Sequence, residues 1–374
     1  MRGTAPLGTI LGVPLRIHWS APALVLFFGY GLAGQTLPAW VPGRSATAYA
    51  VAGLTGALLL GVGLLLHETA HAVTARHHGV RVDDMTVFAL GGVTRMGRPA
   101  RPGVQFAVAG SGPLASLLCG AVSLGAGLGA LDLAHWRLPA AVLLWNGWAN
   151  LLIGGFNLLP AAPLDGGRLL QSALWRRGGD RERAEQVAGR AGQTAGLLLS
   201  AVGFVAVTRG DGGGFWLVLV GLFVWSSALA EVRRATALAA LRGMRVGQVM
   251  SAPDVTGPDW LTADRFLAEV AGRTDQPVVP LVDVDGRPSG LVELVRLFAL
   301  PPARRAGVRA RELGRPLREC PLAAPEDDLV EVLDRATAPP PVLVLRDGVL
   351  VGVVTLADLT TAIRLRTPGR PGAS

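Results

Sequence analysis

Six long stretches of this chain contain no Asp, Glu, Lys or Arg, and they limit the possible fold more than any other feature. The stretches are 17–43, 45–66, 102–131, 138–164, 191–208 and 212–230. About 20 apolar residues are enough for a helix to cross the hydrocarbon layer of a membrane, and each stretch meets or approaches that length. We therefore predict an α-helical polytopic membrane protein with about six transmembrane helices, rather than a soluble protein with buried helices.

Acidic residues are unevenly distributed along the chain. Residues 1–230 contain 9 of the 27 Asp and Glu residues, which leaves 18 for the rest. This change predicts a membrane domain over 1–235, a soluble domain over 236–366 and a disordered, Pro- and Gly-rich tail at 367–374. The formal net charge of +8 would suit nucleic acid. Because arginines cluster between the apolar stretches, where they orient a membrane protein, we expect a lipid bilayer and no nucleic acid as partner.

Arginine placement also predicts the orientation in the membrane. Five arginines lie between the second and third stretches and six between the fourth and fifth, whereas the opposite loops are short and nearly uncharged. Loops rich in arginine stay on the cytoplasmic side. Six crossings would then place both termini and the soluble domain in the cytoplasm, and the protein in the cell membrane.

The second stretch ends in a group of ionisable residues, which are costly within a membrane and therefore indicate function. The sequence HETAH at 67–71 places two histidines four residues apart. On a helix both imidazoles project from one face and can bind one Zn²⁺, while Glu68 beside them can take a proton from a water activated by the metal. The alternative is a set of polar residues at a helix end. That alternative suits His77 and His78 better, because they lie beyond the stretch.

A catalytic zinc site usually has three protein ligands and one open position, so two histidines are not enough. Of the six histidines, His18 and His135 are expected near membrane surfaces away from HETAH, which favours a carboxylate. Asp165 is the candidate, because it lies in the irregular sequence NLLPAAPLDGG at 157–167. Irregular backbone at membrane depth is tolerated where it lines an enclosed or wet cavity. The alternative for Asp165 is a residue of a loop turn.

These two motifs resemble those of the site-2 protease family of intramembrane zinc metalloproteases, peptidase family M50. Further matches are GGV at 91–93 and AGSGPLA at 109–115, and the resemblance covers roughly residues 7–235. It implies a metal site and two catalytic residues. The implied zinc ligands are His67, His71 and Asp165, the general base is Glu68, and the donor to the oxyanion is Asn157.

Two segments, Gly8–Ile17 and Met85–Met96, alternate apolar and small residues and resemble the membrane-associated strands of that family. An extended substrate could add to their sheet edge as a further strand. Pairing of that kind would expose a peptide bond that a helical transmembrane segment keeps hydrogen-bonded. The alternative is that these strands only pack against the helices.

The soluble domain repeats one pattern of helix, strand, turn and strand over about 244–300 and 306–366, which indicates α/β structure. It resembles a CBS-domain pair, a regulatory module that often binds adenine nucleotides. In the second copy, GVVTLAD at 352–358 matches the segment in which a hydroxyl contacts phosphate and an aspartate the ribose, which implies Thr355 and Asp358. The first copy lacks both residues, so one nucleotide site at most is expected. The alternative is a pair that packs, or forms a homodimer, without ligand.

The resemblance implies a zinc metalloendopeptidase that hydrolyses a peptide bond in or near the transmembrane segment of a single-span membrane protein. Such substrates include anti-sigma factors and membrane-bound precursors, and the CBS pair would modulate their cleavage. Two alternatives belong to other classes, a catalytically idle membrane scaffold and a CBS-regulated transporter. The intact Glu68 argues against the scaffold. Transporters often contain an inverted repeat of interrupted helices, and the sequence does not show such a repeat.

Overall fold

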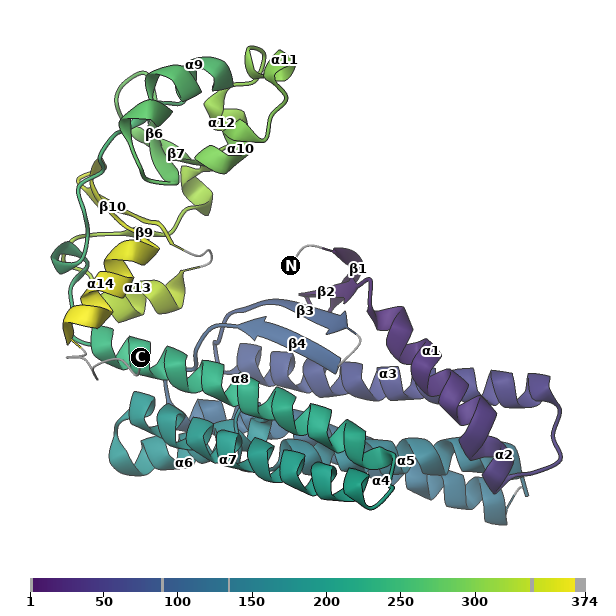
Figure 1. The fold of residues 1–374 in the computed structure, drawn as a ribbon. Coiled ribbons are helices and arrows are strands. Elements are labelled where there is room, and N and C mark those ends of the chain that lie inside the picture. Colours follow the sequence, from purple (N-terminus) through teal and green to yellow (C-terminus); the bar gives the residue numbers. More distant parts are fainter. Residues whose placement is uncertain (1–2, 89–90, 134, 337–339, 367–374) are drawn as a thin grey trace. The chain divides into compact units, whose positions relative to one another are not determined.

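The computed structural model describes residues 3–88, 91–133, 135–336 and 340–366 (Figure 1). The chain divides into two compact units, Met1–Ala235 and Thr236–Ser374. The first contains the apolar stretches and is called the membrane unit below; the second is called the C-terminal unit. The predicted disordered tail at 367–374 lies outside the described residues.

Helices make up most of the membrane unit. They are α1 (Ala21–Gly31), the π-helix η1 (Leu32–Thr36), α2 (Leu37–Trp40), α3 (Ala46–His77), α4 (Pro102–Asp132), α5 (Arg137–Asn157), α6 (Asp165–Gly178), α7 (Arg181–Thr208) and α8 (Gly213–Leu241), which runs on into the C-terminal unit. Local signals set several ends. Ser45 caps α3 by accepting from the backbone N–H of Ala48, Asp180 caps α7 in the same way, and Gly179 ends α6 in the left-handed conformation.

Four of the described helices are long and apolar enough to cross a membrane, namely α3, α4, α7 and α8. The first predicted span is interrupted, because α1, η1 and α2 divide it and its first residues belong to a strand. The fourth corresponds to α5, whose 21 residues include the polar Asn146 and Asn150. The protein is thus a membrane protein by its helices, and the count of about six spans stays a prediction.

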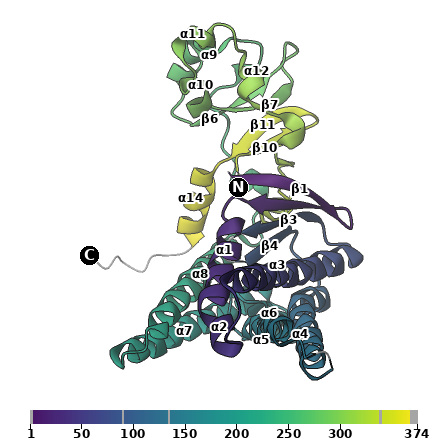
Figure 2. The ribbon, with the colours of Figure 1, turned by 90° about the vertical axis from the view of Figure 1, so that its right-hand side faces the viewer.

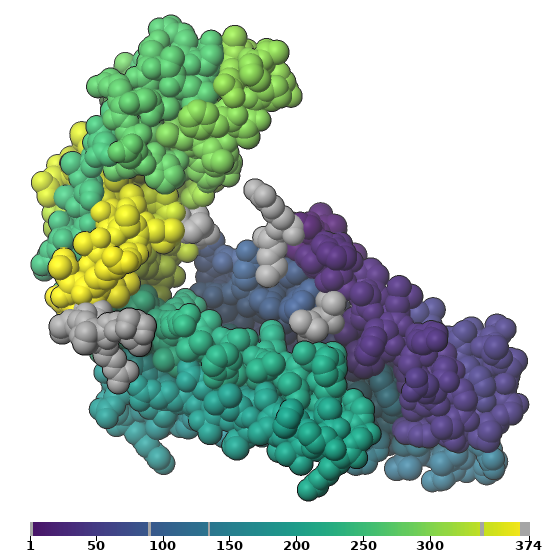
Figure 3. Space-filling model, in the orientation of Figure 1, coloured from purple at the N-terminus to yellow at the C-terminus, as the bar shows by residue number. Residues whose placement is uncertain are grey.

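The outer surface of the membrane unit is strongly apolar. Figures 1 and 2 show α3, α4 and α5 packed side by side, and the space-filling view in Figure 3 shows α8 on the surface. Large apolar side chains on α7 and α8, including Leu198, Phe204 and Phe223, are more than half exposed. A soluble protein rarely exposes contiguous apolar area on this scale, whereas lipid tails can cover it.

A four-stranded sheet lies against α3. Its strands β1 (Thr4–Ile10), β2 (Val13–His18), β3 (Val82–Phe88) and β4 (Gly91–Met96) follow the order β1-β2-β3-β4. Buried Val13, Leu15 and Met85 pack with Ala72 of α3. Each of the two predicted strand segments therefore contains residues of two antiparallel strands, β1 with β2 and β3 with β4. Among the described residues β4 pairs only with β3, which makes it an edge strand.

The C-terminal unit repeats one arrangement of strands and helices. Its elements are η2 (Val246–Gln248), β5 (Gly257–Pro258), α9 (Ala263–Glu269), η3 (Ala271–Arg273), β6 (Val278–Val282), β7 (Pro288–Glu293), α10 (Leu294–Phe298), α11 (Pro302–Arg305), α12 (Ala310–Leu313), β8 (Arg315–Pro316), η4 (Leu317–Glu319), β9 (Leu322–Ala323), α13 (Leu329–Arg335), β10 (Val342–Arg346), β11 (Val349–Val354) and α14 (Leu356–Arg366). In each copy a short strand pairs in parallel with the first strand of an antiparallel hairpin, β5 with β6 and β9 with β10. The predicted two-copy α/β organisation is present.

Candidate metal centre

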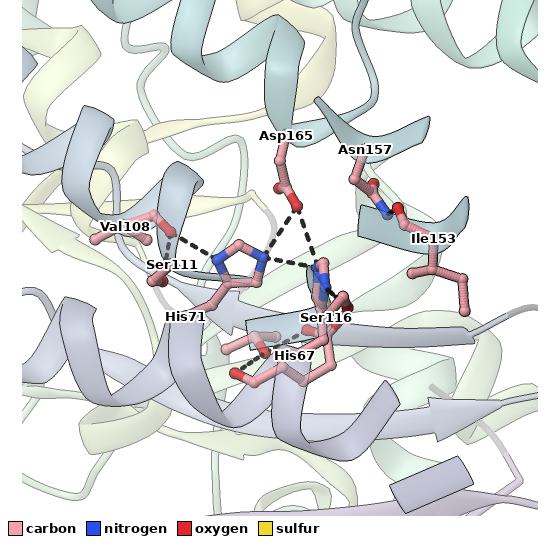
Figure 4. A network of polar contacts seen from close by, with 10 residues as sticks. His67, His71, Val108, Ser111, Ser116, Ile153, Asn157 and Asp165 are labelled. Carbon is pink, nitrogen blue, oxygen red and sulfur yellow. Dashed lines mark hydrogen bonds and ion pairs between the residues drawn. The ribbon is translucent and has the colours of Figure 1, made fainter. Parts of the chain in front are cut away.

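Three ionisable side chains meet inside the membrane unit. His67 and His71 lie one turn apart on α3, and Asp165 is the first residue of α6 (Figure 4). They are only 5%, 4% and 8% exposed. Oδ2 of Asp165 lies 3.2 Å from Nε2 of His67 and 3.1 Å from Nε2 of His71, and the two nitrogens are 3.2 Å apart. The structure thus brings together the three residues that the sequence analysis selected.

The triangle formed by these atoms has the size of one face of a tetrahedral zinc site. Ligands at about 2.0–2.1 Å from zinc lie about 3.3 Å from one another along a tetrahedral edge. The observed sides are 3.1–3.2 Å. Two imidazole nitrogens and one carboxylate oxygen are also a ligand set that zinc enzymes use, with the fourth position open. These residues therefore fit the metal that the sequence predicts.

The outer nitrogen of each imidazole has a partner on α4. Nδ1 of His71 lies 2.7 Å from the backbone oxygen of Val108, and Nδ1 of His67 lies 2.9 Å from Oγ of Ser116. A carbonyl only accepts, so Nδ1 of His71 donates, and in the neutral ring Nε2 then presents a lone pair. Lone pairs at these distances repel unless a cation or a proton lies between them. The hydrogen bonds thus orient the rings for metal binding.

Helix α4 passes the two histidines at Gly112. A methyl group there would lie 2.2 Å from Nε2 of His71 and 2.6 Å from Nε2 of His67. Pro113 follows inside the helix and has no N–H to bond the carbonyl of Ala109, the residue after Val108. The missing side chain at Gly112 lets α4 approach the histidines, and Val108 offers His71 a backbone acceptor.

Two glycines explain how Asp165 is placed. They follow it at the start of α6, where the helix turns back against the loop that precedes it. A methyl group would lie 2.2 Å from the backbone oxygen of Leu159 at Gly166, and 2.4 Å from the backbone nitrogen of Ala162 at Gly167. Any side chain would push α6 away from this loop, so the Asp-Gly-Gly sequence fixes where the carboxylate enters the site.

Glu68 is held from the sheet. Its Oε2 accepts a hydrogen bond of 2.6 Å from Oγ1 of Thr94 on β4. At Gly92, two residues earlier on the same face of the strand, a methyl group would lie 2.3 Å from Cγ of Glu68. The carboxylate is half-buried between α3 and β4, and Glu68 lies between the two histidines in sequence.

Asn157 is the last residue of α5, and its side chain bonds within its own helix. Nδ2 donates to the backbone oxygen of Ile153 over 3.0 Å, as Figure 4 shows. No described contact joins it to the three clustered residues, so its role at the oxyanion stays a prediction. His77 and His78 are exposed at the end of α3, as the sequence predicts.

The sequence analysis gave no role in the site to Ser116, Thr94 or Gly112, although Gly112 lies in the AGSGPLA match. Ser116 and Thr94 lie 49 and 26 residues from their partners along the chain. Gly112 and Ser116 lie four residues apart in α4, which puts them on one helix face. Their spacing, next to Pro113, indicates a helix face that packs closely against another element, but it does not show which element that is.

The second candidate site begins α14 in the C-terminal unit. Oγ1 of Thr355 accepts from the backbone N–H of Asp358, and Oδ2 of Asp358 accepts from the backbone N–H of Thr355 at 2.8 Å. This reciprocal pair is a helix capping box. Oδ1 of Asp358 accepts from Oγ of Ser251 at 2.5 Å. Both carboxylate oxygens are thus engaged within the unit.

Comparison with known proteins assigns the chain to a family. The model of "Peptidase family M50" matches residues 55–131 and 129–202. Rip3 of Mycobacterium tuberculosis, a candidate zinc metalloprotease, is 38% identical over 379 residues, which cover 99% of this chain and 95% of Rip3. The chain belongs to peptidase family M50. As a member it is a membrane metalloprotease, and the matched residues include HETAH and Asp165.

Two solved structures resemble separate parts of this M50 protein. The site-2 protease of Methanocaldococcus jannaschii is 26% identical and matches with a TM-score of 0.43, covering 62% of this chain and 95% of its own. The ATP-bound CBS domain of a bacterial Mg²⁺ transporter of the CNNM/CorC family is 20% identical with a TM-score of 0.30. That match covers 34% of this chain and 92% of the CBS structure.

Proposed function

We propose that this M50 protein is an intramembrane zinc metalloendopeptidase, which hydrolyses a peptide bond in or near the transmembrane segment of a membrane-anchored protein. The observation that carries the proposal is the buried triangle of His67, His71 and Asp165, with sides of 3.1–3.2 Å and with the acidic side chain of Glu68 next in sequence. Membership of the metalloprotease family supports the same activity.

Each residue has a role that its position allows. Zinc bound by the three clustered side chains would supply a Lewis acid for the scissile carbonyl and for the attacking water. Glu68 takes the proton of that water and passes it to the leaving amine. Asn157 is proposed to donate to the oxyanion, which requires Nδ2 to leave the backbone oxygen of Ile153. One such donor is worth about 3 kcal/mol of transition-state stabilisation.

The proposed substrate is a single-span membrane protein, such as an anti-sigma factor or a membrane-bound precursor. Most transmembrane segments are helical, and helical peptide bonds are hydrogen-bonded. The edge strand β4 offers a place where such a peptide bond could be exposed, because among the described residues no strand pairs with its outer edge. An extended substrate segment would pair there, beside Glu68, which β4 contacts through Thr94.

We further propose that the protein lies in the cell membrane, with the Arg-rich loops, both termini and the C-terminal unit on the cytoplasmic side.

The CBS resemblance supports an adenine nucleotide at Thr355 and Asp358, and a homodimer through the C-terminal unit. Binding would require the carboxylate of Asp358 to exchange its bonds to Ser251 and Thr355. Isothermal calorimetry with ATP on the full chain and on Asp358→Ala tests this site, and equal heats from both would refute it.

The main test pairs metal content with cleavage in detergent. Zinc per chain is measured for the wild type and for Glu68→Gln, and both are incubated with a panel of single-span substrates. We expect about one zinc per chain in both proteins and cleavage by the wild type alone. Zinc without cleavage of any substrate would favour the idle scaffold. Failure to bind zinc on reconstitution would refute the metal site and favour the regulated transporter.

A further inference from the structure

The general base in this structure is held by a residue of another element. Oγ1 of Thr94 and Oε2 of Glu68 are 2.6 Å apart, a short bond of the kind a hydroxyl makes to a charged carboxylate. Oγ1 also lies 3.4 Å from the backbone oxygen of Glu68. Among the described contacts, no other side chain bonds to this carboxylate.

The position of Thr94 is itself well determined. It pairs with Met85 of β3, which is only 1% exposed and packs against α3. Gly92 lies on the same face of β4, where its missing side chain makes room for the stem of Glu68. The other face of the strand is pinned by the ion pair between Arg95 and Asp84. Thr94 is therefore a fixed donor rather than a mobile surface residue.

We propose that Thr94 is the positioning residue of the general base, and that its hydroxyl holds the Glu68 carboxylate in the place from which it exchanges protons with the reacting groups. This inference rests on the proposed protease function. A free glutamate side chain samples several rotamers, and holding it in one of them removes that freedom before the reaction starts. A misplacement of about 1 Å can slow a reaction about 100-fold.

Two substitutions separate positioning from packing. Thr94→Val keeps the shape of the side chain and removes the hydroxyl, whereas Thr94→Ser keeps the hydroxyl. Thr86→Val, on the neighbouring strand and without a described bond to Glu68, is the matched control. We expect Thr94→Val to lower kcat about 10- to 100-fold with KM within about twofold, Thr94→Ser to restore most of kcat, and Thr86→Val to resemble the wild type.

A binding measurement tests the same idea without turnover. A hydroxamic acid binds zinc as an anion and gives its proton to a neighbouring base, so its affinity depends on where Glu68 lies. With acetohydroxamic acid we expect Thr94→Val and Glu68→Gln to bind about 10-fold more weakly than the wild type and Thr94→Ser. Zinc content and melting temperature should be equal in all four proteins, since no described hydrogen bond or ion pair joins Thr94 to His67, His71 or Asp165.

The outcomes separate this inference from the proposed function. If the wild type binds zinc and hydroxamate but cleaves nothing, the proposed function fails, and the affinity ratio still decides the role of Thr94. Wild-type kcat and hydroxamate affinity in Thr94→Val would overturn the inference. Loss of zinc or a lower melting temperature in Thr94→Val, restored by serine or not, would also overturn it, because Thr94 would then be structural.

Discussion

Replacing Gly112 by alanine should abolish tight metal binding, although it adds only one methyl group. In a helix interior this change normally favours folding by about 1 kcal/mol, because glycine is a poor helix former. Here the added carbon would lie 2.2 Å from Nε2 of His71 and 2.6 Å from Nε2 of His67. The steric conflict therefore falls on two of the three proposed ligands.

The size of the effect follows from these distances. Ordinary contacts begin near 3.4 Å, so His71 or helix α4 must move by about 1 Å, several times the tolerance of about 0.2 Å of a metal–ligand distance. Loss of a residue that only orients a ligand already costs about 10- to 100-fold in metal affinity. For Gly112→Ala we expect a loss of at least about 100-fold, with cleavage lost in parallel.

The assay is competition for zinc against a chelator of known affinity, in detergent. Gly125→Ala is the matched control, because it lies in the same helix and its added methyl group would have nothing within 4 Å. We expect the control to bind zinc like the wild type and to melt at the same or a higher temperature. If Gly112→Ala keeps wild-type zinc affinity, α4 does not pass the histidines as the structure shows, and the proposed metal centre is wrong.

Three further predictions concern other residues. Ser116→Ala removes the hydrogen bond that orients the His67 ring, so we expect zinc affinity to fall about 10- to 100-fold in the same chelator assay. Unchanged zinc affinity would show that Ser116 does not orient the ring. Asp358→Ala removes a helix cap, so we expect it to lower the free energy of unfolding of the C-terminal unit by about 1 kcal/mol. Denaturant melts should show this loss both with and without nucleotide. A change in the nucleotide-bound melt alone would show that Asp358 serves only the nucleotide. Burial raises the pKa of the Cys320 thiol to about 11. In a Cys119→Ser background, we therefore expect Cys320 to react with iodoacetamide only slowly at pH 8 in the folded protein, and at a normal rate once the protein is unfolded. Fast labelling of Cys320 in the folded protein would refute this prediction. Because that pKa is raised above the unfolded value, the contribution of Cys320 to stability is complete below about pH 9 and is lost as the pH rises towards 11.

The cluster of His67, His71 and Asp165 could be predicted because the sequence patterns that indicate it are local. Two histidines at helical spacing must share a face wherever the helix lies, and the sequence around Asp165 is too irregular for a membrane helix without a reason. Ser116 and Thr94 could not be predicted in this way. Each acts through a contact between separate elements, and a single serine or threonine has too many possible partners for the sequence to choose one.

The number of membrane spans was harder to predict for a different reason. Absence of charge shows that a segment tolerates lipid, but it does not show whether one helix continues through it. The first stretch changes from α-helix to π-helix and back within 21–40, without a charged residue to mark the change. In α5 the buried Asn146 and Asn150 bond to each other, which makes a moderately polar helix suitable for the bundle interior.

The wide separation of the three proposed metal ligands along the chain has a consequence for biogenesis. Asp165 lies 98 and 94 residues after His67 and His71. During synthesis α3 enters the membrane before α6 exists, and two histidines alone make an incomplete ligand set. Metal uptake must therefore follow insertion of α4 and α5, and it then closes a long loop that contains both helices. Before zinc binds, α3 and α6 would be joined through their packing on α4 without this further link.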